Sequence, residues 1–217
     1  MSLIELNDIK KSFGKKEVLK SINLSIANKE IVGLVGKSGA GKSVLIRILI
    51  GFLKAESGKI TINSQSPSPI GYSMQENALY DYLTVKQNLD YFSRINGISR
   101  KIRKERINNL IRNLSLEEYR NILIKNLSGG TKKRVDLACS LLGDPDFLIL
   151  DEPLLGLDPE LVNNFSNFIA DLNKKGTTIL ISSHQINELS QLCSRLVLLK
   201  DGQLFSVKKD QLKNIYK

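Results

Sequence analysis

The eight residues GKSGAGKS, numbered 36 to 43, decide the fold of this chain. They follow an apolar run at residues 31 to 35 that is typical of a strand buried in the middle of a parallel sheet. Three glycines and two lysines make the segment too flexible and too charged to pack into a core. Residues 44 to 50 are apolar on nearly every side, which predicts a helix buried between two layers. The loop therefore connects a buried strand to a buried helix.

The loop matches the pattern G-x-x-x-x-G-K-[ST] of a phosphate-binding loop, in the required strand-loop-helix context. Glycines allow consecutive backbone N–H groups to turn inward around an anion, and the first turn of the next helix adds partial positive charge. We expect Lys42 to reach the β- and γ-phosphates of a nucleotide and the Ser43 hydroxyl to ligate Mg²⁺. The predicted nucleotide-binding residues are Gly36, Lys37, Ser38, Gly39, Ala40, Gly41, Lys42, Ser43 and Val44.

A second set of polar residues follows the buried strand predicted at residues 147 to 150. Open α/β sheets bind ligands at the carboxyl ends of their strands. Asp151 suits Mg²⁺, through water and in support of Ser43, and Glu152 is placed to polarise the water that attacks the γ-phosphate. The only histidine, His184, follows the strand predicted at residues 177 to 181 and could hydrogen-bond the γ-phosphate or that water. The alternatives are a strand-end turn and a surface histidine.

Strand and helix patterns alternate along most of the chain. Residues 18 to 26 alternate apolar and polar side chains, which indicates a half-buried sheet. Residues 84 to 126 instead carry a charged helical pattern, which predicts a helical insertion. Alternation of strands with helices implies a parallel sheet covered on both faces, and therefore an α/β fold. The remaining predicted strands are residues 3 to 9, 59 to 63 and 196 to 199.

Composition limits the class of protein. The chain has 217 residues, which suits one domain or one domain with a subdomain. Its 32 basic residues exceed its 22 acidic ones and give a net charge of +10, which favours an anionic partner. The basic run at residues 100 to 106 is most simply a solvated helix face. Neither a secretion signal nor a membrane-spanning stretch is expected, so any work at a membrane requires a partner.

The sequence Leu127-Ser128-Gly129-Gly130-Thr131 resembles the LSGGQ signature of the ATP-binding cassette (ABC) transporter ATPases. Ser128 and the glycines are suited to cap a following helix, whose free N–H groups form a second anion site. The plainer alternative is an ordinary helix cap. Thr131 replaces the glutamine of the signature, and because the backbone N–H groups are retained we expect contact with ATP to survive.

Further residues match the family in its own order. Phe13 corresponds to the aromatic residue that stacks on adenine, which is usually tyrosine. Gln75 corresponds to the glutamine that senses Mg²⁺ and couples to the membrane subunit, so the resemblance assigns it catalytic and metal-binding roles. Asp158 belongs to the D-loop, and His184 corresponds to the switch histidine. Leu154 and Leu155 depart from the small polar residues that the family often has before the D-loop.

The resemblance also implies an architecture and partners. It implies a single ABC ATPase domain, in which residues 1–83 and 127–217 form a phosphate-loop core with an N-terminal antiparallel β subdomain, and residues 84–126 form a helical subdomain. It implies ATP and Mg²⁺ as cofactors and an ATP-dependent dimer, either a homodimer or a heterodimer with a paralogous ATPase. ATP would lie between the phosphate loop of one protomer and the signature of the other. A transmembrane permease would hold the cytoplasmic chain at the inner face of the membrane.

Two stretches of the sequence bear on the role within the family. The stretch ENALYDYLTVKQNLDYF at residues 76–92, followed by INGISRK at 95–101, is similar to subunits of ABC-2-type exporters. An alternative is an ABC ATPase without transport, serving cofactor assembly or cell division. DNA-repair members need long coiled coils and translation members need two cassettes, so we expect no specific nucleic-acid partner and only weak, salt-sensitive binding.

Overall fold

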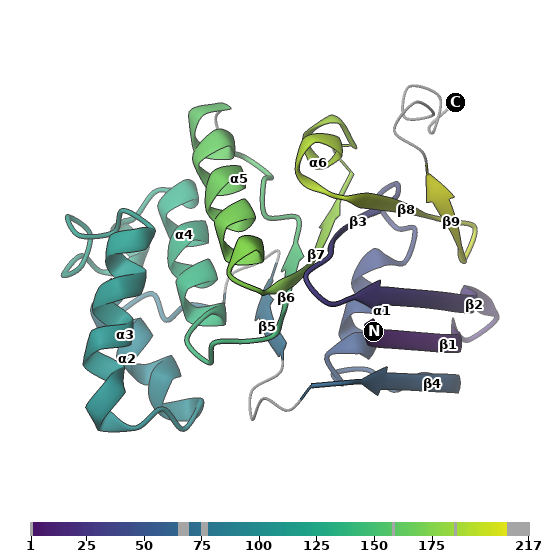
Figure 1. Ribbon diagram of the computed structural model, residues 1–217, viewed down its shortest axis with the longest axis horizontal. Helices are drawn as coiled ribbons and strands as arrows, with labels where there is room; N and C mark the ends of the chain where they lie inside the picture. Colours follow the sequence, from purple (N-terminus) through teal and green to yellow (C-terminus); the bar gives the residue numbers. More distant parts are fainter. Residues whose placement is uncertain (1, 65–69, 75–77, 158, 185, 208–217) are drawn as a thin grey trace.

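The computed structural model describes residues 2–64, 70–74, 78–157, 159–184 and 186–207. Two β-sheets and a group of helices are arranged along its long axis (Figure 1). The predictions made for Gln75 and Asp158 lie outside the described residues.

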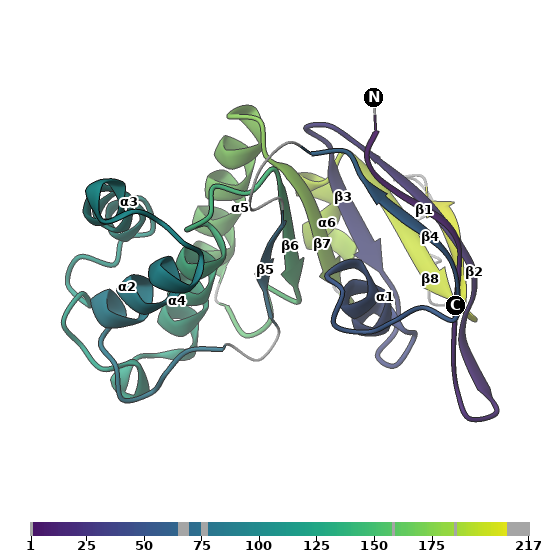
Figure 2. The ribbon, with the colours of Figure 1, turned by 90° about the horizontal axis from the view of Figure 1, so that it is seen from below.

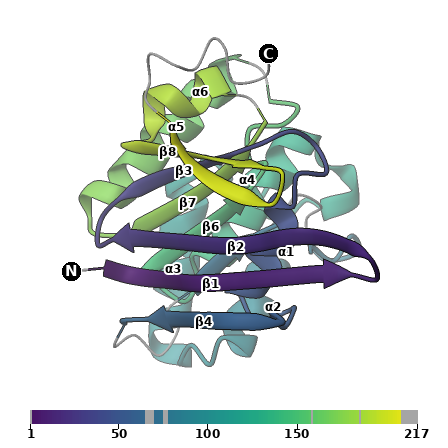
Figure 3. The same cartoon turned by 90° about the vertical axis from the view of Figure 1, so that its right-hand side faces the viewer.

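The N-terminal sheet has three antiparallel strands in the order β2-β1-β4 (Figure 3). They are β1 (Ser2–Phe13), β2 (Lys16–Ala27) and β4 (Ser57–Ile62). Along β2, Ile22, Leu24 and Ile26 are buried while the residues between them are exposed, because successive side chains of a strand point to opposite faces. The predicted antiparallel β subdomain is therefore confirmed.

The second sheet has six strands in the order β5-β6-β7-β3-β8-β9. The first five are parallel, and β9 pairs with β8 in the antiparallel sense. Every residue of β3, β6 and β7 is buried, as the continuous apolar runs predicted. These three strands are neighbours, so their carboxyl ends meet at one edge of the sheet. The strands are β3 (Ile31–Val35), β5 (Ile70–Ser73), β6 (Phe147–Asp151), β7 (Thr178–Ser183), β8 (Arg195–Lys200) and β9 (Gln203–Val207).

Helices cover both faces of the six-stranded sheet, as predicted. Helix α1 (Lys42–Leu49) lies between the two sheets, and its apolar side chains join those of both sheets in one core (Figure 2). Helices α5 (Pro159–Lys174) and α6 (Ile186–Leu192) belong to the core on the opposite face. The sheet therefore presents the end of β3 directly to the start of α1.

The chain between β5 and β6 is helical. It contains α2 (Val85–Ile95), α3 (Arg100–Asn113), the 3₁₀ helix η1 (Ile124–Asn126) and α4 (Gly129–Ser140), grouped at the end of the molecule away from the antiparallel sheet (Figure 2). Helix α2 begins with a reciprocal pair of hydrogen bonds between Thr84 and Gln87. In the described part of the chain, no helix is long and apolar enough to cross a membrane.

Candidate nucleotide-binding site

The glycine-rich loop connects β3 to α1, which begins at Lys42. Gly41 caps the helix with φ 105°, a left-handed conformation that favours glycine. At Gly36 the constraint is space, because an added Cβ would lie 2.7 Å from the carbonyl oxygen of Leu199. Two of the glycines in the pattern are therefore required by the backbone itself.

Lys42 is 7% exposed and points back into the loop. Its Nζ donates hydrogen bonds to the carbonyl oxygens of Gly36 (2.8 Å) and Lys37 (3.4 Å). It also forms an ion pair with Glu152 Oε1 at 3.4 Å. The loop therefore wraps around a buried ammonium group, which is suited to binding an anion there.

Glu152 connects the loop to the end of β7. Its Oε2 lies 3.0 Å from His184 Nδ1, and its backbone N–H donates to the carbonyl oxygen of Ser182 at 3.1 Å. The residue has a φ of 51°, a left-handed backbone that costs a side-chain-bearing residue about 1 kcal/mol or more. This turn brings Lys42, Glu152 and His184 into one chain of contacts, as their positions after neighbouring parallel strands predicted.

Asp151 is the last residue of β6 and is 3% exposed. The hydroxyl of Ser182 donates a hydrogen bond to its Oδ1. Burial, reinforced by the nearby charge of Asp151, raises the pKa of Tyr72 to about 12, so that phenol stays neutral. Ser182 was not identified from the sequence, because a serine at the end of a strand has no distinguishing pattern. It fixes one carboxylate oxygen of Asp151.

An open cavity of about 610 Å³ lies over the loop, within the usual range for small-molecule sites. It includes most of the predicted nucleotide-binding residues, whereas Gly36, Lys37 and Ala40 form the loop without lining the cavity. Lys16 and Val18 were missed; the only sequence signal was their place in the hairpin that follows Phe13. The lining residues are Phe13, Lys16, Val18, Ser38, Gly39, Gly41, Lys42, Ser43, Val44, Glu152 and His184.

The oxygen atoms near the loop fit Mg²⁺. Ser43 lines the cavity, and Asp151 supplies a carboxylate at the end of β6. Mg²⁺ is usually held by one or two protein oxygens, with water and substrate phosphates as its other ligands. Among the described residues no group of three or more His, Cys, Asp or Glu side chains could hold a metal alone.

Ser128 caps α4, as predicted. Its Oγ accepts a hydrogen bond from the backbone N–H of Thr131 at 3.2 Å and lies 2.9 Å from the Thr131 hydroxyl. Ser128 and Gly129 are exposed, whereas the Thr131 side chain is buried and accepts from Arg134 at 3.3 Å. In the described part of the chain, none of these residues lines the nucleotide cavity. The signature therefore presents free N–H groups elsewhere on the surface.

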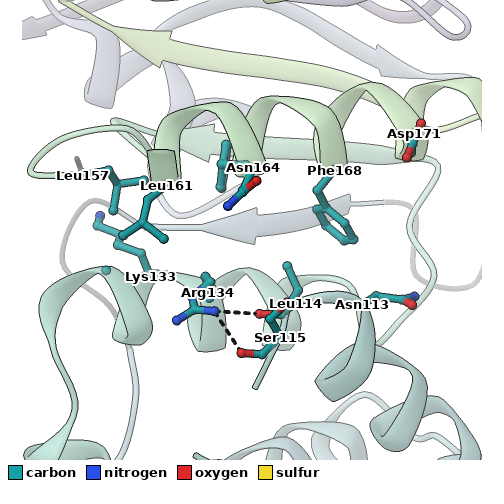
Figure 4. A pocket seen from close by; sticks show the side chains of 12 residues that line it. Asn113, Leu114, Ser115, Lys133, Arg134, Leu157, Leu161, Asn164, Phe168 and Asp171 are labelled. Carbon is teal, nitrogen blue, oxygen red and sulfur yellow. Dashed lines mark hydrogen bonds between the residues drawn. The ribbon is translucent and has the colours of Figure 1, made fainter. Parts of the chain in front are cut away.

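Helix α4 is braced from two sides (Figure 4). The Nη1 of Arg134 donates to the carbonyl oxygens of Leu114 (3.1 Å) and Ser115 (2.9 Å), just after α3 ends. On the other side, an added Cβ at Gly130 would lie 3.0 Å from Leu161 Cδ1 of α5. A cavity of about 390 Å³ lies between α4, α5 and the end of α3, and Gly130, Arg134 and Leu161 are among its lining residues. The position of the signature thus depends on both α3 and α5.

A phosphate loop at the edge of a parallel sheet, with a carboxylate pair and a histidine beside it, defines a phosphate-loop nucleoside triphosphatase. The glycine-rich cap of α4 at Ser128 narrows the class of nucleoside triphosphatase. The family model described as "ABC transporter" matches residues 19–155, and the chain belongs to that family. The resemblance based on the signature is therefore confirmed, and the chain is an ABC ATPase.

Curated relatives cover most of the chain. Linearmycin resistance ATP-binding protein LnrL of Bacillus subtilis is 32% identical, and the match spans 94% of this chain and 68% of the LnrL chain. Nod factor export ATP-binding protein I of Rhizobium sp. is 36% identical, and the match spans 92% of this chain and 68% of that protein. Probable sulfate/thiosulfate import ATP-binding protein CysA of Chlorella vulgaris is 34% identical and covers 95% and 91%. Both export and import proteins are therefore among the relatives.

Solved structures agree with the fold. An ATP-binding subunit of an ABC transporter superposes with a TM-score of 0.86 at 28% identity, covering 98% of this chain and 92% of that one. A dimeric ATP-binding cassette in a post-hydrolysis state, bound to ADP and Pi, superposes with a TM-score of 0.85 at 26% identity, covering 94% and 98%. The likeness to a nucleotide-bound cassette supports ATP binding.

Proposed function

We propose that this chain binds ATP with Mg²⁺, hydrolyses it, and uses the cycle to energise transport through a separate membrane-spanning partner. The observation that carries this proposal is the contact chain from Lys42 through Glu152 to His184 at the mouth of the phosphate loop. A buried cation, a carboxylate and an imidazole are the groups that hold a γ-phosphate and orient a water molecule toward it.

Each residue of the site has a proposed role that follows from its position. Lys42 and the loop N–H groups neutralise the phosphates, and Phe13, half-exposed at the cavity, stacks on adenine. Glu152 orients and deprotonates the attacking water, while His184 holds the γ-phosphate or that water. Bound Mg²⁺ would be held by Ser43 and, through water, Asp151, and would neutralise developing charge. Gln75 is proposed to contact the metal and report its presence to the membrane partner.

The active form is proposed to be a head-to-tail dimer, either a homodimer or a heterodimer with a paralogous ATPase. The support is geometric: Ser128 and Gly129 are exposed at a helix N-terminus, yet lie outside the cavity of their own chain. A second protomer would bring these N–H groups to the γ-phosphate and complete the site. Asp158 would lie at the same interface.

The surface proposed to contact the permease surrounds α2. Tyr82 is 78% exposed. The rings of Tyr80 and Tyr91 pack edge to face, with their centroids 4.7 Å apart. Exposed aromatic side chains of this kind are enriched in protein interfaces. We call Tyr80, Tyr82, Tyr91 and Ile95 the aromatic patch. Docking there would place the chain in the cytoplasm, peripheral to the inner face of the membrane.

Export is the proposed direction, because residues 76–92 and 95–101 are similar to ABC-2-type subunits and because LnrL and the Nod factor protein are named for resistance and export. An ABC ATPase without a transport role is the alternative. Co-expression with a membrane protein of about six spans, followed by detergent extraction and affinity purification, separates the two. A complex weakened by Tyr82→Ala and Tyr91→Ala, with ATP affinity unchanged, supports transport. A complex that tolerates both changes contradicts this docking surface.

A further inference from the structure

A second polar cavity, of about 490 Å³, lies between α2 and α3, which pack side by side (Figure 2). Six basic side chains line it against a single carboxylate. They come from α2, from α3 and from the segment that follows α3. We call it the basic cleft; its lining residues are Lys86, Asp90, Arg94, Arg100, Arg103, Lys104, Ile107, Asn108 and Arg120.

The charges of the basic cleft are mostly unbalanced. Asp90 binds two of the arginines, Arg94 at 2.8 Å and Arg103 at 3.4 Å. The side chains of Lys86, Arg100 and Lys104 form no hydrogen bond or ion pair within the part of the chain that the structure describes. Positive charges that converge from three segments repel one another, so the folded chain gains if an anion enters.

Backbone contacts hold this arrangement together. The backbone N–H of Lys86 donates to the carbonyl oxygen of Arg120 at 3.0 Å, which keeps the two side chains on the same cavity. The Nη2 of Arg120 in turn donates to Asn108 Oδ1 of α3 at 2.8 Å. The cleft is therefore built by the fold, whereas a run of basic residues along one exposed helix would be only a solvated surface.

The start of α3 is open to an anion as well. Ser99 caps this helix without a side-chain hydrogen bond, and the first turn has no acidic residue. Helices favour acidic residues there, because their N-terminal N–H groups carry partial positive charge. The first turn instead contains Arg100 and Arg103, which are three residues apart and repel. Helix α2 shows the ordinary solution, with Thr84 and Gln87 satisfying its first N–H groups.

One donor in the wall of the cleft is buried without a partner. The Nε of Arg103 has no hydrogen-bond acceptor among the described residues, and its side chain is only 15% exposed. A buried donor on a charged group that lacks an acceptor is costly. Because the Nε atom is closed to solvent, an anion in the cleft meets the exposed cations around Arg103 rather than this donor.

We propose that the basic cleft is a phosphate-binding site, separate from the nucleotide site, that takes the phosphate group of a small anion or of an acidic lipid. A phosphate oxygen accepts from the N–H groups at the start of α3, while Arg100 and Lys104 neutralise its charge. Tyr91 and Ile95 of the aromatic patch lie on the same helix as Lys86 and Arg94. Only the lipid source depends on the proposed membrane docking; the free anion does not.

The test compares two double variants of α3 that lose the same charges. Arg100→Gln with Lys104→Gln removes two cations from the cleft. Lys101→Gln with Arg112→Gln removes one arginine and one lysine from the same helix, outside the cleft. Backbone amide NMR signals of residues 99–104 report on the site while inorganic phosphate is added, with chloride at equal ionic strength as the reference. Sedimentation with vesicles of phosphatidylcholine, with or without phosphatidylglycerol, tests the lipid source.

The expected result is a saturable shift of those amide signals with phosphate, absent with chloride. The apparent affinity should fall at least tenfold in the Arg100 and Lys104 variant and less than threefold in the control. Cleft-dependent binding of the phosphatidylglycerol vesicles identifies the lipid as the source, whereas cleft-dependent phosphate binding without it identifies a soluble anion. Equal losses in the two variants, or no saturation in either arm, overturns the proposal. ATP hydrolysis, followed in parallel, tests the proposed function separately.

Discussion

Glu152→Gln is the substitution that most directly probes the nucleotide site. The carboxylate lies 3.4 Å from Lys42 Nζ through one oxygen and 3.0 Å from His184 Nδ1 through the other. Glutamine keeps the size of the side chain but removes the charge and replaces one of the two acceptor oxygens with an NH₂ donor. It therefore separates the electrostatic role of Glu152 from its packing.

Two magnitudes follow from this geometry. Unit charges 3.4 Å apart attract by about 5 kcal/mol at an effective dielectric constant near 20, and desolvation of the buried pair offsets much of that attraction. Lys42 keeps its bond to the Gly36 carbonyl oxygen, so we expect the free chain to lose about 1–3 kcal/mol of unfolding free energy. Loss of the base that activates water should slow hydrolysis by about 10²–10⁴-fold.

Stability and hydrolysis fall in this variant, but the affinity for ATP should not. In the native chain the phosphates compete with Glu152 for Lys42, and in the variant they do not. We therefore expect ATP affinity to be equal or higher, and thermal unfolding with saturating Mg–ATP to recover the stability lost by the free chain. Single-turnover hydrolysis, equilibrium dialysis and thermal unfolding measure these three quantities. Hydrolysis within threefold of the native rate, or weaker ATP binding, would refute the role given to Glu152.

Three further outcomes are expected. Lys42→Ala should weaken ATP binding at least a hundredfold in equilibrium dialysis, and unchanged affinity would remove Lys42 from the site. Gly130→Ala should lower the unfolding temperature because its Cβ meets α5, whereas Gly129→Ala, whose Cβ meets open space, should raise or preserve it; the reverse order would contradict the packing. Burial raises the pKa of Glu30, but hydrogen bonds from Arg195 and a backbone N–H more than offset it, so the pKa is below 4.5. The Glu30 carboxylate should stabilise the fold fully above pH 4.5, and this contribution should be lost as pH falls through the lowered pKa. The difference in unfolding temperature between the native chain and Glu30→Gln should therefore shrink in acid.

Local sequence pattern was enough to predict those strands and loops whose residues serve a single structural role. The apolar run before Gly36 predicted a central strand, and β3 is buried along its length. The polar residues after β6 and β7 converge because parallel strands end at one edge. The Ser128 cap followed from the preference of serine for that position.

Other features depended on contacts across the chain. The strand β5 was missed because Ile70–Ser73 has only four residues, and β9 was missed because an edge strand carries polar side chains. The contacts of Lys42 with Glu152 join residues 110 positions apart along the chain. The basic run from Arg100 was predicted to be a solvated helix face, and Arg100 and Lys104 are exposed. The sequence did not show that α2 packs against α3 so that these side chains also line a cleft.

Light scattering with Mg–ATP measures the mass of the Glu152→Gln chain and shows whether two protomers share each nucleotide. We expect a dimer, because each nucleotide joins the phosphate loop of one protomer to the Ser128 helix of the other. Adding Ser128→Asp, which keeps a good helix cap but faces the γ-phosphate with a negative charge, should abolish the dimer and leave the ATP affinity of the single chain unchanged. Ser128→Asn, a neutral cap, should retain it. A dimer that forms equally well with aspartate at this position would contradict the shared site.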